Sequence, residues 1–142
     1  MNRELRYERV IQASLARVFE LFTSPAGQRA FYGRDEPGWV VESRCELRVG
    51  GAWEIAFGPS PDELYRHRHV FEAIERPHRL LLGTTESRPD GSSLAFSTEF
   101  TFAPRDGATL MTMVQWGFPS DQLRDEHGRG LPHAFDRLER AL

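Results

Sequence analysis

Two histidines separated by a single arginine give this chain its clearest chemical signal. They lie in the segment "LYRHRHVFEA", residues 64–73, where Arg66 and Arg68 alternate with His67 and His69. Such a segment would suit a metal site, a catalytic pair, a nucleic-acid-binding stripe or a β-strand with one solvent-exposed face. The alternation favours a strand, because successive side chains of a strand point to opposite faces of the sheet.

The cost of burying arginine predicts which face of this strand lies inside. A guanidinium group stays charged and is costly to bury without a partner, whereas an imidazole readily becomes neutral. We therefore expect the arginines to face solvent and the histidines to face the interior. The interior face then forms a pocket wall of Tyr65, His67, His69 and Phe71, beside Trp53 and Ile55 if segments 51–57 and 64–75 pair.

A metal site would require more ligands than the two histidines supply, because zinc takes a third and usually a fourth protein ligand. His78 falls in a predicted turn, and His133 faces away from the apolar stripe of its helix. Only His127 is placed to join the pair. We therefore predict no metal.

Three roles remain open for the two histidines. A neutral imidazole titrates close to working pH, so His67 or His69, with Tyr65 beside them, could act as acid or base on a bound molecule. A hydrogen bond to a polar ligand atom is simpler, and we favour it. A purely structural role is the third alternative.

Composition excludes several classes of function. The net charge is −3 without any run of like charges, which argues against nucleic acid as a partner. All 18 basic residues are arginine, so Schiff-base chemistry and the lysine-dependent phosphate-binding loop are excluded. Cys45 is the single cysteine, which excludes an internal disulfide and fits a structural role. With no signal sequence and no long apolar stretch, we expect a cytoplasmic protein without membrane insertion and without a cofactor.

The order of predicted elements indicates an α+β protein. A strand over 4–13 precedes two short helices, which begin at the capping residues Ser14 and Ser24 and end near residues 23 and 32. A long C-terminal helix follows Ser120, and we expect a kink or break near 128–132, because glycines and a proline interrupt it there. Short turns predict an antiparallel meander between them, with strands over 39–47, 51–57, 64–75, 79–88, 92–103 and 108–117.

The last predicted strand is apolar on both faces. Leu110, Val114 and Trp116 alternate there with Met111, Met113 and Gln115. One of these faces should be covered, and a second subunit of a homodimer is our candidate for the cover.

Four segments, in this order and spacing, resemble one known family. They are "ASLARVFELFTSP" (13–25), "CELRVGGAWEIAF" (45–57), "IERPHRLLL" (74–82) and the stretch from "DGATLMTMVQWGF" at 106 to the end of the chain. Together they resemble the START/Bet v 1-like (SRPBCC) superfamily, in the branch related to the activator of Hsp90 ATPase homologue 1. The resemblance covers nearly all of residues 1–142, which we interpret as one domain.

The resemblance implies a helix-grip fold, in which a curved seven-stranded antiparallel sheet grips the long C-terminal helix around a hydrophobic pocket. Members of the superfamily bind lipids, polyketides, hormones and other hydrophobic small molecules, and some act as aromatases or cyclases. Two positions depart from the pattern: Leu131-Pro132 and Phe31-Tyr32 stand where relatives often have tryptophan. Both departures lie where a pocket would be lined.

These observations together predict a protein that binds a hydrophobic or aromatic small molecule in an internal pocket. The alternatives are a cyclase-, aromatase- or hydrolase-like enzyme and a module that binds a chaperone. The expected ligand-binding residues are Phe31, Trp53, Ile55, Phe57, Tyr65, His67, His69, Phe71, Phe96, Phe100, Leu131 and Phe135.

Overall fold

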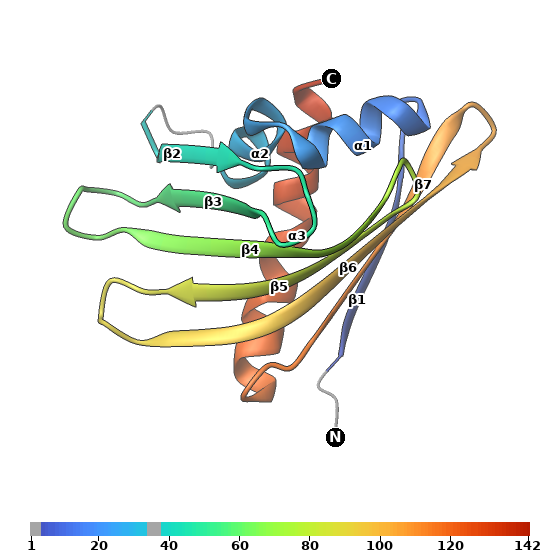
Figure 1. The fold of residues 1–142 in the computed structure, drawn as a ribbon. Coiled ribbons are helices and arrows are strands. Elements are labelled where there is room, and N and C mark those ends of the chain that lie inside the picture. Colours follow the sequence, from blue (N-terminus) through green and yellow to red (C-terminus); the bar gives the residue numbers. More distant parts are fainter. Residues whose placement is uncertain (1–3, 34–37) are drawn as a thin grey trace.

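The computed structural model describes residues 4–33 and 38–142 (Figure 1). Its elements follow the predicted order of strand, two short helices, six strands and a long helix. They are β1 (Leu5–Ile11), α1 (Leu15–Thr23), α2 (Pro25–Tyr32), β2 (Val40–Cys45), β3 (Ala52–Phe57), β4 (Tyr65–Glu75), β5 (Arg79–Ser87), β6 (Ser93–Arg105), β7 (Ala108–Trp116) and α3 (Asp121–Arg140).

The described strands form one antiparallel sheet of seven strands in the order β1-β7-β6-β5-β4-β3-β2. The last six strands make the predicted meander, and β1 returns to pair with β7, from Leu5 opposite Gln115 to Ile11 opposite Thr109. Figure 1 shows the sheet curving around α3, with α1 and α2 at one end of that helix. The predicted helix-grip arrangement is therefore confirmed.

Serine caps set the starts of all three described helices. The side-chain oxygens of Ser14, Ser24 and Ser120 accept hydrogen bonds from backbone N–H groups at 3.2, 3.3 and 3.2 Å. Each bond satisfies one of the N–H groups that the first helical turn leaves without a partner. Both N-caps of the short helices and the cap of α3 lie where the sequence predicts them.

Of the kink or break expected near 128–132, the break does not occur. Helix α3 continues through Pro132, which lies on its exposed side. A proline removes one helical hydrogen bond, but the freed carbonyl can then be hydrated when that side of the helix faces water. Leu131, Ala134 and Phe135 are buried on the opposite side. The packing of these buried side chains stabilises the helix on both sides of Pro132. A prediction from local helix propensity alone leaves this packing out.

The core lies where α1, α2 and α3 meet the inner face of β6 and β7. The Phe22 ring lies 4.7 Å from Phe100 and 5.9 Å from Phe135, measured between ring centroids. Phe135 in turn lies 5.1 Å from both Tyr7 and Phe31. This aromatic cluster fixes α2 and α3 at one end of the sheet.

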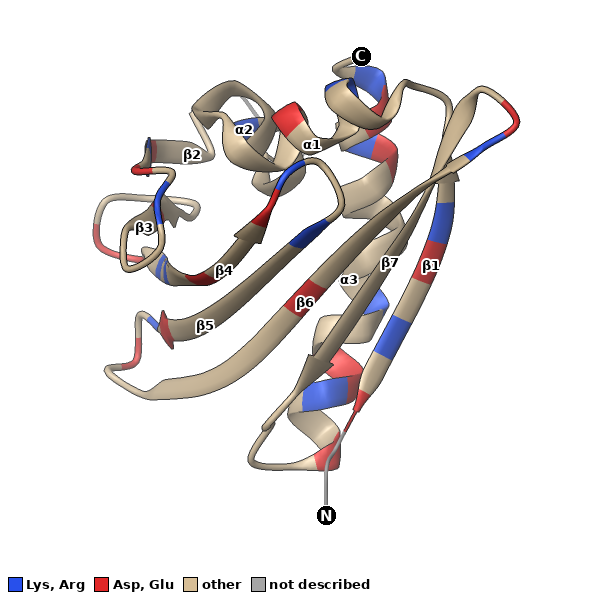
Figure 2. Cartoon of the chain, turned by 45° about the vertical axis from the view of Figure 1, so that its right-hand side comes forward, with Lys and Arg blue, Asp and Glu red and all other residues tan. Residues whose placement is uncertain are grey.

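The outer face of β7 carries the apolar residues that the sequence places there. Leu110, Val114 and Trp116 are half-buried, and Val10 of neighbouring β1 is 37% exposed. Figure 2 shows that β7 carries no charged residue, whereas charges alternate along β1 beside it. A covering subunit on this face stays a prediction.

Gly27 is expected to tolerate no side chain, because α1 and α2 approach each other there. A Cβ at Gly27 would overlap the backbone carbonyl of Leu21 and lie 2.7 Å from its Cα. Since backbone atoms cannot move away cheaply, Gly27→Ala should lower the free energy of unfolding by about 1–3 kcal/mol. Urea denaturation measures this change.

Gly130 provides the matched control, because a Cβ there meets nothing within 4 Å. Gly130→Ala in α3 should raise the free energy of unfolding by up to about 1 kcal/mol, owing to the better helix propensity of alanine. If Gly27→Ala were as stable as Gly130→Ala, the packing described for the α1–α2 junction would be wrong.

Candidate functional site

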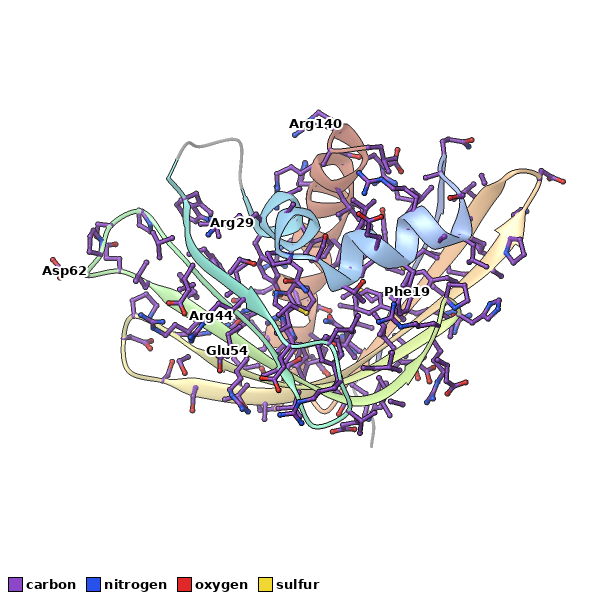
Figure 3. The ribbon with its side chains drawn as sticks, turned by 45° about the horizontal axis from the view of Figure 1, so that its top comes forward. Phe19, Arg29, Arg44, Glu54, Asp62 and Arg140 are labelled. Carbon is purple, nitrogen blue, oxygen red and sulfur yellow. The ribbon has the colours of Figure 1, made fainter. Side chains whose placement is uncertain are left out.

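Strand β4 has the predicted register, with histidines inside and arginines outside. His67 and His69 are 7% and 4% exposed, whereas Arg66 and Arg68 face solvent. Arg68 pairs there with Glu54, with Nε and Oε1 3.1 Å apart. Glu54 also accepts from Arg44 of β2 at 2.7 Å, and Figure 3 labels both residues on this side of the sheet. These charged side chains pair with one another on the outer face of the sheet, and the imidazoles of β4 lie on the inner face.

A cavity of about 720 Å³ lies between the inner face of the sheet and helices α2 and α3. Its mouth is marked by exposed lining residues from the β3–β4 loop, the β5–β6 turn and α3, namely Pro59, Glu63, Pro89, Asp90 and Glu126. Most of the expected ligand-binding residues line this cavity: Phe31, Trp53, Phe57, Tyr65, His67, His69, Phe96, Phe100 and Leu131.

Ile55, Phe71 and Phe135 are not on the cavity wall. Ile55 is 2% exposed, and Phe71 and Phe135 are fully buried in the core. Phe135 is enclosed by the aromatic cluster at the end of the sheet. Face parity predicts that these side chains point inward, but it does not predict which inward side chains the helices cover.

The two histidines meet the hydroxyl of Tyr32, at the last position of α2. The phenol oxygen lies 2.8 Å from His67 Nδ1 and 3.0 Å from His69 Nε2. On the other side of each imidazole lies a residue of β5. His67 Nε2 is 2.6 Å from Glu86 Oε1, and His69 Nδ1 is 2.6 Å from Thr84 Oγ1. The result is a continuous hydrogen-bonded chain from β5 through β4 to α2.

Glu86 is a buried carboxylate surrounded by donors. Besides His67, Arg88 Nε lies 2.7 Å from Oε2, and His127 Nε2 of α3 lies 3.4 Å from Oε1. Burial raises the pKa of Glu86, but hydrogen bonds with His127, His67 and Arg88 outweigh burial and hold that pKa far below its ordinary value. The carboxylate is therefore ionised at neutral pH.

The charge of Glu86 fixes the direction of the chain. A carboxylate only accepts, so His67 donates from Nε2 and, when neutral, accepts from the Tyr32 hydroxyl at Nδ1. Because the Tyr32 proton is then engaged, His69 donates from Nε2 to the phenol oxygen and accepts at Nδ1 from Thr84. All four hydrogen bonds thus run from Thr84 towards Glu86.

Burial keeps the two imidazoles and the phenol of this chain neutral. It lowers the pKa of His67, although Glu86 acts in the opposite direction, and it lowers the pKa of His69 still further below its ordinary value. Burial, followed by the negative charge of Glu86, raises the pKa of Tyr32 far above its ordinary value. At neutral pH the cavity wall holds two neutral imidazoles and a protonated phenol.

A second polar pair crosses the apolar floor of the cavity. Gln115 of β7 donates from Nε2 to Thr98 Oγ1 of β6 at 3.1 Å, and the two residues are 5% and 2% exposed. Among the described residues, Gln115 Oε1 and Trp53 Nε1 have no hydrogen-bond partner although both are buried. Both residues line the cavity. One acceptor and one donor there are left for a bound molecule or water.

Sequence reasoning missed Thr84 and Glu86, and it noted Tyr32 only within the Phe31-Tyr32 departure, without naming it as a site residue. Thr84 and Glu86 follow Leu80 and Leu82 at alternate positions of β5, so period-two parity could have placed them on the inner face. The contacts of Tyr32 with the two histidines had no comparable signal, because they join residues 35 and 37 positions apart. His127, the one further candidate for a metal site, lies instead beside Glu86. Within residues 4–33 and 38–142, no group of three or more His, Cys, Asp or Glu side chains is arranged to hold a metal ion.

Stability should fall as the pH drops, because His69 is buried in its neutral form. In the unfolded chain a histidine takes up a proton near its ordinary pKa of about 6.5, whereas folded His69 resists protonation. The unfolded state then binds more protons, so the free energy of unfolding falls between about pH 7 and about pH 5, by up to about 1.4 kcal/mol per pH unit for this proton. Urea denaturation across this range measures the slope.

His69→Gln should flatten that slope, since glutamine does not titrate. Part of the dependence should remain, because the pKa of His67 is shifted in the same direction. Equal slopes in the wild type and the variant would contradict the neutral, buried assignment of His69.

The arrangement defines a helix-grip protein with an internal, partly polar cavity between sheet and C-terminal helix. The chain belongs to the family described as Activator of Hsp90 ATPase homolog 1-like protein, whose family model matches residues 12–142. A search of curated proteins finds no match. In the part of the chain that the structure describes, no helix has the length and apolar character needed to span a bilayer.

Solved structures share this fold at low sequence identity. The Mll3558 protein from Rhizobium loti aligns with a TM-score of 0.81 and 19% identity, covering 100% of this chain and 98% of its own. Protein CV1439 from Chromobacterium violaceum aligns with a TM-score of 0.79 and 20% identity, covering 96% and 95%. A protein from Arthrobacter aurescens aligns with a TM-score of 0.79 and 17% identity, covering 97% and 84%. These similarities show the fold.

Proposed function

We propose that this protein binds a hydrophobic or aromatic small molecule in the cavity between the sheet and α3. The observation that carries the proposal is the cavity itself. Its volume of about 720 Å³ lies within the range of about 300–1,000 Å³ typical of small-molecule sites. Proteins of this fold typically bind ligands in such a cavity.

The chemistry of the wall supports an aromatic occupant with a few polar atoms. Phe31, Trp53, Phe57, Phe96 and Phe100 supply large apolar surfaces on several sides. The polar groups of the lining are the chain through Tyr32, the Thr98–Gln115 pair and the indole N–H, together with charged or titratable side chains of the β5 end, α3 and the mouth. Small-molecule sites combine an apolar lining with a few fixed polar groups in the same way.

A thermal-shift screen with aromatic and lipid-like compounds tests the proposal. A compound that binds the folded protein at about 100 times its dissociation constant stabilises it by about 2.7 kcal/mol, which corresponds to several degrees in Tm. We expect flat, largely apolar molecules with one or two polar groups to give such shifts. Failure of a broad library of such compounds to shift Tm would contradict the proposal.

A further inference from the structure

The hydroxyl of Tyr32 lies between a proton acceptor and a hydrogen-bond donor on the cavity wall. It donates to His67 Nδ1 at 2.8 Å and accepts from His69 Nε2 at 3.0 Å. A phenol oxygen has two lone pairs, so one lone pair is left after these two bonds. Because Tyr32 lines the cavity, a hydroxyl group of a bound molecule can donate to this lone pair.

His67 is placed to take up the proton that such a bond would pass on. Its Nε2–H donates to Glu86 at 2.6 Å, so a positive charge formed on the ring would lie beside a buried carboxylate. This is the hydroxyl–imidazole–carboxylate arrangement in which a carboxylate orients an imidazole and stabilises its protonated form. The remaining titratable or charged groups around His67 are His69, His127 and Arg88, of which His127 and Arg88 also contact Glu86.

We propose that the cavity takes a ligand with a weakly acidic hydroxyl group, a phenol or an enol, and binds it as the anion by proton relay through Tyr32 to His67. This inference rests on the proposed function of the cavity. The ligand O–H bond breaks and its proton forms a new O–H bond on Tyr32, while the original Tyr32 proton moves to His67 Nδ1. The electron pair stays on the ligand oxygen, and no net charge is gained or lost.

The relay ends in a stabilised state without a tyrosinate. His67 and His69 then both donate to the Tyr32 oxygen, and Tyr32 donates to the ligand anion. Because the pKa of Tyr32 is high, its hydroxyl stays protonated: it receives the ligand's proton as it releases its own to His67. The imidazolium lies between the ligand anion and Glu86, so neither negative charge is left unpaired in the interior.

The mouth of the cavity favours entry of the neutral molecule. Its exposed charged lining residues are three carboxylates, Glu63, Asp90 and Glu126, whereas the lining arginines Arg88 and Arg137 are half-buried. A negatively charged ligand would be repelled there, whereas a neutral phenol or enol would not. Ionisation inside the cavity reconciles an acidic entrance with an interior in which the Tyr32 hydroxyl, itself held by both imidazoles, donates a hydrogen bond to an oxygen anion.

Absorption spectroscopy with 4-nitrophenol tests this inference, because the neutral probe and its phenolate absorb at different wavelengths. The titration is made at a pH at which the free probe is almost wholly neutral. We expect the bound probe to show the phenolate band in the wild type. The chain contains no lysine, so no amine side chain can produce this signal.

Two variants and one control locate the proton acceptor. Tyr32→Phe and His67→Gln should bind the probe in its neutral form, with loss of the phenolate band. Tyr7→Phe removes a hydroxyl from β1, outside the cavity lining, and should keep the band. Binding of 4-nitroanisole, which has no acidic proton, shows that each variant is folded and retains the cavity.

The outcomes separate the inference from the proposed function. If the wild type binds both probes but holds 4-nitrophenol in its neutral form, the relay is wrong and the binding cavity stands. A phenolate band that persists in Tyr32→Phe also overturns the relay, since another base then takes the proton. If the wild type binds neither probe, the inference fails together with the aromatic-ligand proposal.

Discussion

Replacing Phe135 by alanine is expected to lower the free energy of unfolding by about 3–5 kcal/mol. Phe135 is fully buried, and its ring lies 5.1 Å from Tyr7 and Phe31 and 5.9 Å from Phe22. Because these partners come from β1, α1 and α2, they cannot all collapse into the space that alanine would leave. Equilibrium urea denaturation measures the loss.

Phe135→Leu is the matched control, since leucine fills most of the same volume. It should cost less than about 1.5 kcal/mol. If Phe135→Ala were no less stable than Phe135→Leu, the aromatic cluster would not be what fixes α3 against the sheet.

Replacing Glu86 by glutamine should lower the free energy of unfolding by about 2–3 kcal/mol. The carboxylate is 4% exposed and accepts from His67 and Arg88, and its removal takes away the only anion that hydrogen-bonds Arg88 among the described residues, leaving the weaker attraction of Glu126. Losing one partner of a buried pair costs about 3–5 kcal/mol, and the Arg88 side chain is 24% exposed, which reduces the cost. Thermal or urea denaturation at neutral pH measures the change.

Glu99→Gln removes a similar carboxylate from the outer face of the sheet. Glu99 pairs with Arg79 at 2.8 Å, but both side chains are about one third exposed, at 31% and 30%. Such a pair contributes about 0–1 kcal/mol, so this variant should be close to the wild type. Equal losses for Glu86→Gln and Glu99→Gln would show that Glu86 is not the buried centre of the polar cluster.

The register of β4 could be predicted because arginine and histidine differ so much in the cost of burial. The same physical contrast predicted the outward arginines and the inward imidazoles of residues 66–69 before any pairing was known. Likewise, Ser14, Ser24 and Ser120 predicted three helix starts from local hydrogen-bonding chemistry. Local rules succeed where the deciding interaction lies within a few residues.

The partners of the histidines could not be predicted, because a β-bulge sets them. Near the turn Glu75 pairs with Arg79 and Ala73 with Leu81, and the register shifts by one residue between Phe71 and Ala73. If the pairing seen near the turn continued without that shift, Ser87 would lie opposite His67 and Thr85 opposite His69. The bulge brings Glu86 and Thr84 opposite the histidines instead. A single unpaired residue therefore decides the chemistry of the cavity wall.

Tyr32 depends on tertiary packing alone. It lies at the end of a helix that is eight residues long, and its ring packs against Trp53 and Phe57 of β3 at 5.8 and 5.1 Å. The sequence identifies the helix but not the angle at which α2 meets the sheet. That angle places the hydroxyl between the two imidazoles.

The cavity can be narrowed from α3 at Ala134, which is 7% exposed and lines its wall. Phenylalanine at this position would extend into the space that we assign to the ligand. His133→Phe places the same side chain on the exposed side of the same helix. Far-UV circular dichroism checks that both variants are folded, because overpacking at Ala134 can cost about 1–3 kcal/mol.

Calorimetric titration of 4-nitroanisole into the wild type, Ala134→Phe and His133→Phe tests the ligand-binding cavity most directly. We expect one site of similar affinity in the wild type and in His133→Phe, and clearly weaker binding in Ala134→Phe. Binding to Ala134→Phe with the affinity of the wild type would contradict the assignment of the ligand to this cavity.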